Sequence, residues 1–221
     1  MNAKQAAAYK AVGYIQDGMI VGLGTGSTAY WAIHYLAERV AQGLKITTVA
    51  TSESTTSIAA EKGIKVSSLD SVEYIDIDID GADEVDSMLN LIKGGGGALL
   101  REKIVAAASR EFIVIADESK LVDVLGRFPL PVEVLAFGRE HTARHLQRLG
   151  CRPVLREKDG QVYITDNGHQ ILDCHFNAIP DPALLAQQIN AIPGVVENGL
   201  FVGMAKKVIV GYADGSAKEL G

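Results

Sequence analysis

Three observations predict an α/β fold for this chain of 221 residues. Short apolar runs alternate with helical segments along its first half, beginning with the strand expected at 19–23 and the helix expected at 27–42. A glycine-rich turn separates that strand from that helix. The alternation stops near the segment from Phe128 to Pro131, after which strands are mixed with two helices. We therefore expect a parallel sheet covered on both faces by helices, and a smaller α+β unit after it.

Hydrophobic periodicity and glycine stops give the bounds of the expected elements. In the first half we expect helices at 3–16, 27–42, 52–62 and 94–109, and strands at 19–23, 46–50, 64–66, 74–79 and 112–116. In the second half we expect strands at 132–135, 162–165, 171–175, 195–202 and 208–210, and helices at 140–149 and 182–191. Whether the last strand returns to the first sheet stays open at this point.

Composition and charge exclude several classes of function. The net charge is −6, with 21 Lys and Arg against 27 Asp and Glu, which argues against broad binding to nucleic acid or to anionic membranes. Cys151 and Cys174 form no CxxC pair, so we expect reduced thiols and a cytoplasmic location. No signal peptide is read at the N-terminus. Residues 19–37 lack charged side chains, but glycines, serine and threonine interrupt them, so a membrane span is rejected.

The first chemical signal is GLGTGST, residues 22–28, which lies between a strand and a helix. Glycines let a backbone approach an anion closely, and the N–H groups at a helix start point toward it. Ser27 and Thr28 add hydroxyl donors and are candidate caps for the helix. A P-loop is excluded, and the expected acid of a dinucleotide site is missing after the second strand. The phosphate of a small molecule fits better, with an ordinary tight turn as the alternative.

The second signal is the alternating segment IDIDIDGADEVD, residues 75–86. Alternation places three isoleucines on one face of a strand and Asp76, Asp78 and Asp80 on the other. For Asp76 and Asp78 we favour a polar, partly solvated face. Asp80 and Asp83 flank Gly81 and Ala82 at the carboxyl end of the strand, where open α/β sheets bind ligands. Binding and a self-capped turn are equally favoured for this pair by spacing alone.

The third signal is LIKGGGGALLREK, residues 91–103. Four consecutive glycines cost backbone entropy, which makes a mere linker a weak explanation. Lys93 beside this loop is a cation for a phosphate or a developing oxyanion. Leu100, Ile104, Ala107 and Ala108 share one face of the following helix, and Glu102 projects roughly opposite. Periodicity favours a solvated glutamate, whereas a general base beside the glycine loop is the functional interpretation.

Other candidates carry less weight. His141 and His145 are four residues apart on an expected helix, but no third ligand stands nearby, so a metal site is disfavoured. Lys120 follows the FIVIADES strand and is a candidate for the same site, with a surface lysine as the usual alternative. Lys4 is a weaker candidate of the same kind.

Taken together and in order, GLGTGST, DGADEVD, LIKGGGGALLREK, FIVIADESK, FPLPVEV and IPGVVENGLF resemble type A ribose-5-phosphate isomerases. The resemblance runs from the first helix to near residue 211, and DGAD followed by KGGG and REK is its most specific part. It implies a Rossmann-like catalytic domain over 1–127 plus about 203–221, and a ferredoxin-like α+β lid domain over 128–202. It also implies a homo-oligomer, a dimer or a tetramer, with no metal and no organic cofactor.

The resemblance also implies roles for individual residues. Glu102 matches the catalytic base, and Asp80, Asp83 and Lys93 match residues that handle the sugar. The remaining substrate-binding positions that it implies are Thr25, Gly26, Ser27, Thr28, Gly81, Ala82, Gly94, Gly95, Gly96 and Lys120. Asp76 and Asp78 make the strand more acidic than we expect for the family, which puts the packing of that face in question and not the chemistry.

The activity implied is the interconversion of D-ribose 5-phosphate and D-ribulose 5-phosphate through a cis-enediol(ate), a step of the non-oxidative pentose phosphate pathway. The alternative from another class is a non-catalytic sugar-phosphate sensor of related fold. Such sensors usually carry a helix-turn-helix before this domain, whereas here the first strand is expected near residue 19. An amino-sugar phosphate deaminase, a CoA transferase and a dinucleotide oxidoreductase are disfavoured by the REK glutamate beside DGAD and by the missing ribose-binding acid.

Overall fold

The computed structural model describes residues 1–221, which divide into two compact units. The first unit comprises residues 1–82, 101–121 and 203–221, and the second comprises 83–100 and 122–202. The domain bounds expected from the sequence put 83–100 and 122–127 in the first unit, whereas both segments belong to the second. For 83–100 the reason is that β4 (Glu84–Val85) and β5 (Leu91–Ile92) pair with each other, and β5 also pairs with β13 (Leu200–Phe201).

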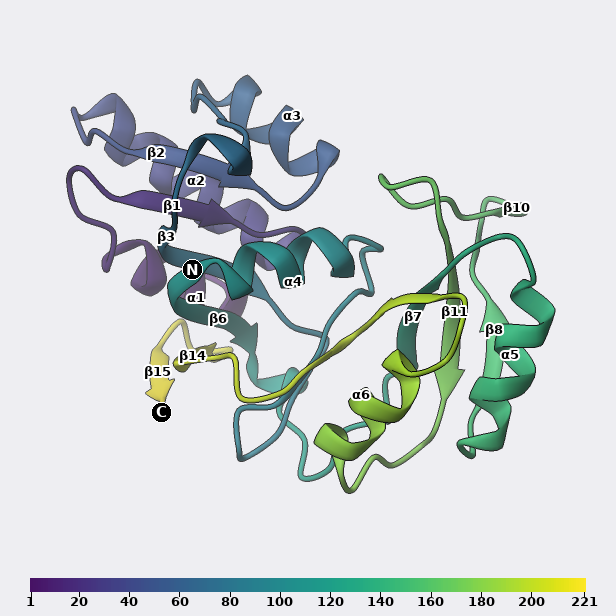
Figure 1. The fold of residues 1–221 in the computed structure, drawn as a ribbon. Coiled ribbons are helices and arrows are strands. Elements are labelled where there is room, and N and C mark those ends of the chain that lie inside the picture. Colours follow the sequence, from purple (N-terminus) through teal and green to yellow (C-terminus); the bar gives the residue numbers. More distant parts are fainter. The chain divides into compact units, whose positions relative to one another are not determined.

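The first unit contains a six-stranded sheet (Figure 1). Its order is β15-β14-β6-β3-β1-β2, with bounds Ala217–Leu220, Lys207–Gly211, Ser109–Asp117, Ile75–Gly81, Ile20–Leu23 and Thr47–Ala50. All neighbours are parallel except β15, which pairs antiparallel with β14. The end of the chain therefore returns to the first sheet, which settles the point that the sequence left open.

Helices cover both faces of this sheet, as the alternating pattern predicts. The apolar face of β3 joins α1 (Ala3–Val12), α2 (Ser27–Ala41) and α3 (Glu53–Glu61) in one core cluster. On the opposite face, Val105 of α4 (Leu99–Ala107) packs with Val49 and Ile75. Figure 1 shows α4 in front of the sheet and α2 behind it. No helix of the chain is long and apolar enough to cross a bilayer.

The second unit has the ferredoxin-like arrangement that the resemblance implies. Its chain order is β7 (Leu130–Val134), α5 (Arg139–Arg148), β8 (Arg152–Leu155), β11 (Gln170–His175), α6 (Pro182–Asn190) and β12 (Val195–Asn198). The sheet order is β12-β7-β11-β8, and every pairing is antiparallel. This is the β-α-β-β-α-β pattern. A short ribbon of β9 (Glu157–Lys158) and β10 (Gln161–Val162) lies between β8 and β11 in the sequence.

Several expected elements are shorter than predicted. The expected strand at 64–66 is reduced to a single bridge between Thr48 and Val66. The expected helix at 94–109 begins only at Leu99, because Gly94 and Gly97 adopt positive φ angles of 102° and 85° that a helix does not accept. The four glycines therefore form a loop before α4.

Candidate active site

The loop after β1 is held against the end of β3 by backbone hydrogen bonds to Asp80. Asp80 is fully buried, and its Oδ1 accepts the N–H of Thr25 at 2.9 Å and that of Gly81 at 2.7 Å. The N–H of Gly24 donates to the carbonyl of Ile79 at 3.0 Å. A Cβ on Gly24 would lie 2.5 Å from the Cα of Asp80 and closer still to its carboxylate. Glycine at position 24 is therefore what lets Asp80 occupy the turn.

Beneath the same loop lies a cluster of hydroxyl groups. The Thr25 hydroxyl is 2.7 Å from that of Thr51, 2.8 Å from that of Ser52 and 3.0 Å from that of Thr55. The Thr55 hydroxyl donates to the carbonyl of Gly24 at 2.9 Å. Thr51, Ser52 and Thr55 are buried, so their hydroxyl groups fix the Thr25 side chain on its buried side. The sequence analysis missed these three residues, although the hydroxyl-rich segment at 51–57 was a signal for them.

The N-terminus of α2 follows the loop and lacks a side-chain cap. Its N-cap residue is Gly26, with φ 108° and no capping hydrogen bond, so the expectation that Ser27 or Thr28 caps this helix is wrong. Gly26 and Ser27 are exposed. Lys4 of α1 donates from Nζ to the Ser27 hydroxyl at 2.8 Å. Uncapped amide groups with a cation nearby are a suitable site for an anion.

The acidic face of β3 is turned toward α4. A Cβ added to Gly22 would lie 2.5 Å from Asp78 Oδ1 and 2.9 Å from Val105 Cγ1 of that helix. Asp78 is fully buried, so the partly solvated face expected for it is wrong. The glycine opposite provides the room, since Gly22 pairs in register with Asp78. Asp76 is half-buried, as expected, and accepts the N–H of Ile20 at 2.9 Å.

Glu102 lies on the buried face of α4, which reverses the periodicity argument. It is 3% exposed, whereas Ile104 on the face expected to be apolar is 47% exposed. Val105 and Ala106 are buried with Glu102. The solvated glutamate that periodicity favoured is therefore wrong. The Glu102 carboxylate is instead buried on the face of α4 that carries Val105 and Ala106.

Lys120 follows β6 at the same edge of the sheet. It ends the 3₁₀ turn Glu118–Lys120, in which the N–H of Ser119 donates to the Asp117 carboxylate. β3 and β6 run parallel, with Gly81 opposite Ile115, so their carboxyl ends lie at one edge. The half-buried Lys120 is placed where open α/β sheets bind ligands.

The second unit carries the remaining candidates, Asp83, Lys93 and the glycine loop. Asp83 accepts the N–H of Gly95 at 2.7 Å through Oδ2. Lys93 is 2% exposed, its N–H donates to the carbonyl of Gly199 at 2.8 Å, and its Nζ lies 5.4 Å from the centre of the Phe201 ring. Gly95 and Gly96 are exposed, as a loop that meets a ligand requires.

Known proteins resemble this chain over nearly its whole length. The profile of the family "Ribose 5-phosphate isomerase A (phosphoriboisomerase A)" matches residues 47–215. A ribose-5-phosphate isomerase A of Rhodopseudomonas palustris (strain TIE-1) is 57% identical, covering 96% of this chain and 94% of its own. One of Bacillus mycoides (strain KBAB4) is 51% identical, covering 97% and 98%.

The chain belongs to the ribose-5-phosphate isomerase A family.

Solved structures of the family agree in fold. The ribose 5-phosphate isomerase A of Methanocaldococcus jannaschii has a TM-score of 0.93 at 43% identity, covering 98% of this chain and 97% of its own. A D-ribose-5-phosphate isomerase in complex with phospho-erythronic acid has a TM-score of 0.96 at 42% identity, covering 100% and 99%. The α/β fold and the family resemblance predicted from sequence are thereby confirmed.

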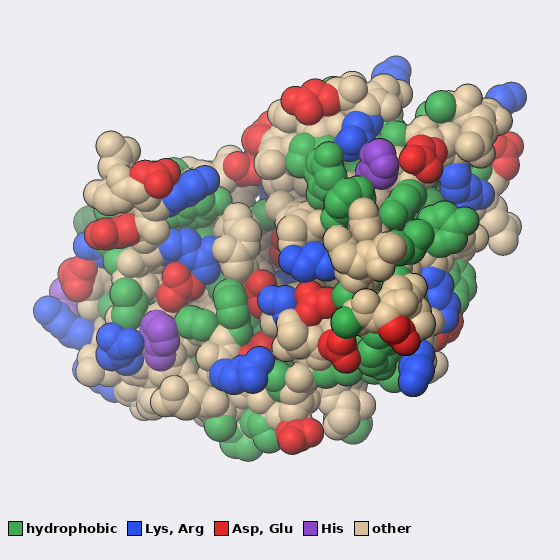
Figure 2. Space-filling view, turned by 180° about the vertical axis from the view of Figure 1, so that it is seen from behind, with side chains coloured by type: hydrophobic (Ala, Val, Ile, Leu, Met, Phe, Trp, Pro, Cys, Tyr) green, Lys and Arg blue, Asp and Glu red, His purple; other side chains and the backbone are tan.

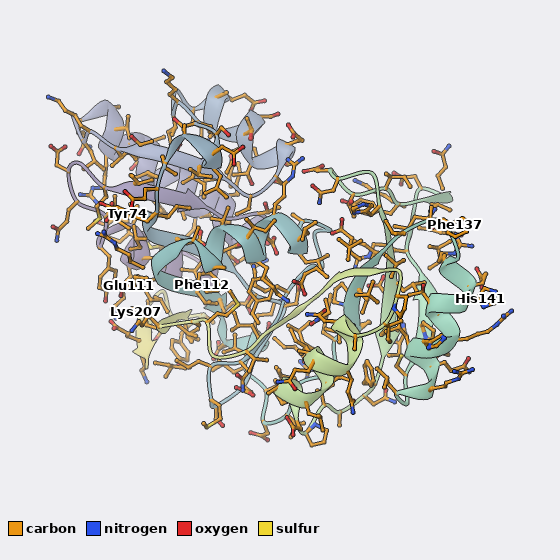
Figure 3. All side chains as sticks on the ribbon, in the orientation of Figure 1. Tyr74, Glu111, Phe112, Phe137, His141 and Lys207 are labelled. Atoms are coloured by element: carbon orange, nitrogen blue, oxygen red, sulfur yellow. The ribbon has the colours of Figure 1, made fainter.

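We call the candidate residues of the first unit, Thr25 to Thr28, Asp80, Glu102 and Lys120, and those of the second, Asp83, Lys93 and the glycine loop, the two half-sites. The histidines and cysteines singled out from the sequence lie outside both. No group of three His, Cys, Asp or Glu side chains is placed to hold a metal ion. His141 and His145 are exposed, and Figure 3 shows His141 on α5. Cys151 and Cys174 are free and buried, and the hydrogen bond that the Cys174 thiol shares with Cys151, together with burial, raises the pKa of Cys174. A thiol kept protonated in this way is a poor nucleophile.

Proposed function

We propose that this chain interconverts D-ribose 5-phosphate and D-ribulose 5-phosphate. The observation that carries the proposal is the burial of Glu102, at 3% exposure, on the helix that follows the glycine loop. A carboxylate is a suitable group here, because one residue must take a proton from carbon and later return it. The ligand of the solved relative, phospho-erythronic acid, is itself a phosphorylated small acid, which supports a sugar-phosphate substrate.

In the proposed mechanism Asp80 assists the opening of the furanose ring. Glu102 then takes the proton from C2, the C1–C2 bond gains double-bond character, and a cis-enediol(ate) forms. The proton on Glu102 returns to C1 while the proton of the O2 hydroxyl passes to O1, so the product is the ketose. No electrons leave the substrate, and the step therefore needs no redox partner.

The remaining groups stabilise charge and hold the phosphate. Lys93 and Asp83 are assigned to the oxygens on C1 and C2, where negative charge develops, together with the amides of Gly94 to Gly96. The loop from Thr25 to Thr28, the uncapped start of α2 and Lys4 are assigned to the phosphate. Lys120, at the carboxyl edge of the sheet, is assigned to the substrate as a further cation.

The test is an isomerisation assay in EDTA with Glu102→Gln as the central variant. We expect turnover of ribose 5-phosphate by the unchanged chain, and a kcat lower by about 10²–10⁴-fold in Glu102→Gln, which keeps the shape and removes the base. Glu111→Gln is the matched control. Glu111 pairs with Lys207 and lies near the start of β6, whereas the candidate residues lie at the carboxyl end of that strand (Figure 3). Near-normal turnover by Glu102→Gln would remove Glu102 from its role.

The same assay separates the enzyme from the sensor. Tight binding of ribose 5-phosphate without any ribulose 5-phosphate would favour a non-catalytic sensor. We also propose a homo-oligomer, a dimer or a tetramer as in the family, to be measured by light scattering. A cytoplasmic location is proposed on the two free buried thiols, Cys151 and Cys174.

A further inference from the structure

Arg156, just after β8, binds the glycine loop on one side and a carboxylate on the other. Its Nη1 donates to the carbonyl of Gly94 at 2.8 Å and to that of Gly95 at 3.2 Å. Its Nε donates to Asp173 Oδ2 at 2.9 Å, and its Nη2 donates to Asp173 Oδ1. The side chains of Arg156 and Asp173 are 13% and 21% exposed, so their ion pair is largely shielded from water. All of these residues belong to the second unit.

Asp173 is held in place by the second sheet and so fixes the position of Arg156. It lies on β11, a central strand of the second sheet, opposite Pro131 of β7 and Val154 of β8. The planar guanidinium binds the carboxylate with two of its nitrogens and keeps the third for the loop. A lysine carries the same charge on a single flexible nitrogen and cannot make both contacts in a fixed geometry.

The loop that Arg156 holds has one backbone hydrogen bond of its own, from the N–H of Gly97 to the carbonyl of Gly94 at 2.9 Å, which closes a single turn. Glycine backbones are the most mobile of all, so a run of four needs support from outside to keep one conformation. The Tyr163 hydroxyl adds a donor to the carbonyl of Gly96 at 3.3 Å. Three consecutive carbonyls of the loop are therefore bound by side chains of one segment, residues 156–163.

Because the peptide bond is planar, a hydrogen bond that fixes the direction of a carbonyl also fixes the direction of the N–H in the same peptide plane. The N–H of each residue points away from the carbonyl that precedes it. With the Gly94 carbonyl on Arg156, the N–H of Gly95 turns to the other side, where it donates to Asp83 at 2.7 Å. With the Gly95 carbonyl on Arg156, the N–H of Gly96 also turns away from the guanidinium, in a part of the loop that is exposed.

We propose that Arg156, oriented by Asp173, is a positioning residue of the isomerase, which sets the glycine loop so that its amides face Asp83 and the sugar phosphate. The proposal rests on the proposed function, because it assigns the loop amides to the substrate. Arg156 does not touch the substrate, and its effect passes through the peptide planes of Gly94 and Gly95. Asp173 in turn acts only through Arg156.

The experiment compares Arg156→Lys and Arg156→Gln with Arg139→Gln. Arg139 is a matched control in the same unit, since it binds Glu140 and Gln170 and not the loop. We expect both Arg156 variants to raise KM for ribose 5-phosphate and to weaken binding of phospho-erythronic acid by about 10–100-fold, the loss of one or two hydrogen bonds to a charged group. Arg139→Gln is expected to stay within about twofold of the unchanged chain, a free-energy difference well below that of one such bond.

Two further readouts distinguish positioning from folding. Methylguanidinium is expected to restore part of the activity of Arg156→Ala, whereas methylammonium does not, because only the former has the planar fork. Asp173→Asn combined with Arg156→Gln is expected to cost little more than Arg156→Gln alone, since the two side chains act as a unit. If Arg156→Gln fails to fold in a denaturant titration, Arg156→Lys carries the same comparison.

Binding of phospho-erythronic acid keeps this test separate from that of the proposed function. Absence of turnover in the unchanged chain would contradict the isomerase, while the binding comparison would still decide the role of Arg156. Unchanged KM and unchanged binding in folded Arg156→Lys and Arg156→Gln would overturn the proposal. So would additive effects of the Asp173 and Arg156 substitutions, or a failure of methylguanidinium to rescue folded Arg156→Ala.

Discussion

The two half-sites are held in place by different means. In the first unit, Asp80 is fixed by backbone N–H groups of Thr25 and Gly81, which come from a loop and a strand already placed by the parallel sheet. In the second unit, long side chains such as Arg156 hold a glycine loop that forms one turn, from Gly94 to Gly97, and belongs to no helix or strand. We therefore expect the first half-site to be most sensitive to added atoms, such as a Cβ on one of its glycines. The second half-site should be most sensitive to the loss of the side chains that hold its loop.

Gly24→Ala is expected to have the largest effect, because it attacks the rigid half-site directly. The new Cβ would meet the Cα of Asp80 at 2.5 Å, so main chain and not a side-chain end must move. We expect the free energy of unfolding to fall by about 3 kcal/mol, at the upper end for overpacking, and isomerase activity to be lost. A denaturant titration and the isomerisation assay measure the two effects.

Gly95→Ala is the counterpart in the other half-site and the control for the first substitution. The nearest atoms to its Cβ would be those of the Asp83 carboxylate, with the oxygens at 2.6 and 2.9 Å and Cγ at 3.0 Å, at the end of a side chain. We expect a change in unfolding free energy below about 1 kcal/mol, with reduced activity, because the Asp83 carboxylate must move. Equal losses of stability in Gly24→Ala and Gly95→Ala would contradict the difference between the half-sites.

Lys93→Met sharpens the comparison by removing a charge from the second half-site at nearly constant volume. We expect kcat to fall by about 10²-fold, the typical cost of losing one group that stabilises developing charge. In Lys93→Met the terminal methyl group takes the place of the ammonium group over the Phe201 ring and can still pack there, so the fold should persist. Unchanged kcat and KM in a folded Lys93→Met variant would remove Lys93 from the chemistry.

Lys4→Ala is expected to have the smallest effect. Its Nζ reaches Ser27 beside the uncapped start of α2, but the contact is at the surface, where salt screens it. We expect KM for ribose 5-phosphate to rise by about fivefold at low salt, corresponding to about 1 kcal/mol, and less at high salt, with kcat little changed. Lys10→Ala on the same helix is the control, because Lys10 binds the Ala217 carbonyl instead.

The parts of the fold that follow from local pattern could be predicted from the sequence. The alternation correctly separates Ile77 and Ile79, on the apolar face of β3, from Asp78 and Asp80, whereas Ile75 packs with Val105 of α4 on the other face. Glu102 was misjudged because helical periodicity assumes that the buried face is the apolar one, and here a carboxylate is buried while Ile104 is exposed. The domain boundary was missed because β4 and β5 have two residues each and their sheet is completed by β13, far along the chain.

Arg156 shows a different limit of sequence reasoning. It stands 62 positions from Gly94 and 17 from Asp173, and no local pattern connects them. Only the antiparallel pairing of β8 with β11 brings the arginine beside the carboxylate. Residues whose role depends on such pairings become visible only once the strand order is known.

Gly22 of β1 and Gly24 just after it have a consequence for how this chain can change in evolution. Gly22 and Gly24 stand opposite Asp78 and Asp80, and each glycine leaves the volume that the neighbouring acid fills. A methyl group at position 22 becomes admissible only in a lineage whose position 78 has first exchanged its acid for something smaller. Among relatives, the residues at positions 22 and 78 should therefore vary together. The substitution at position 78 should precede the one at position 22, because the reverse order would create a clash.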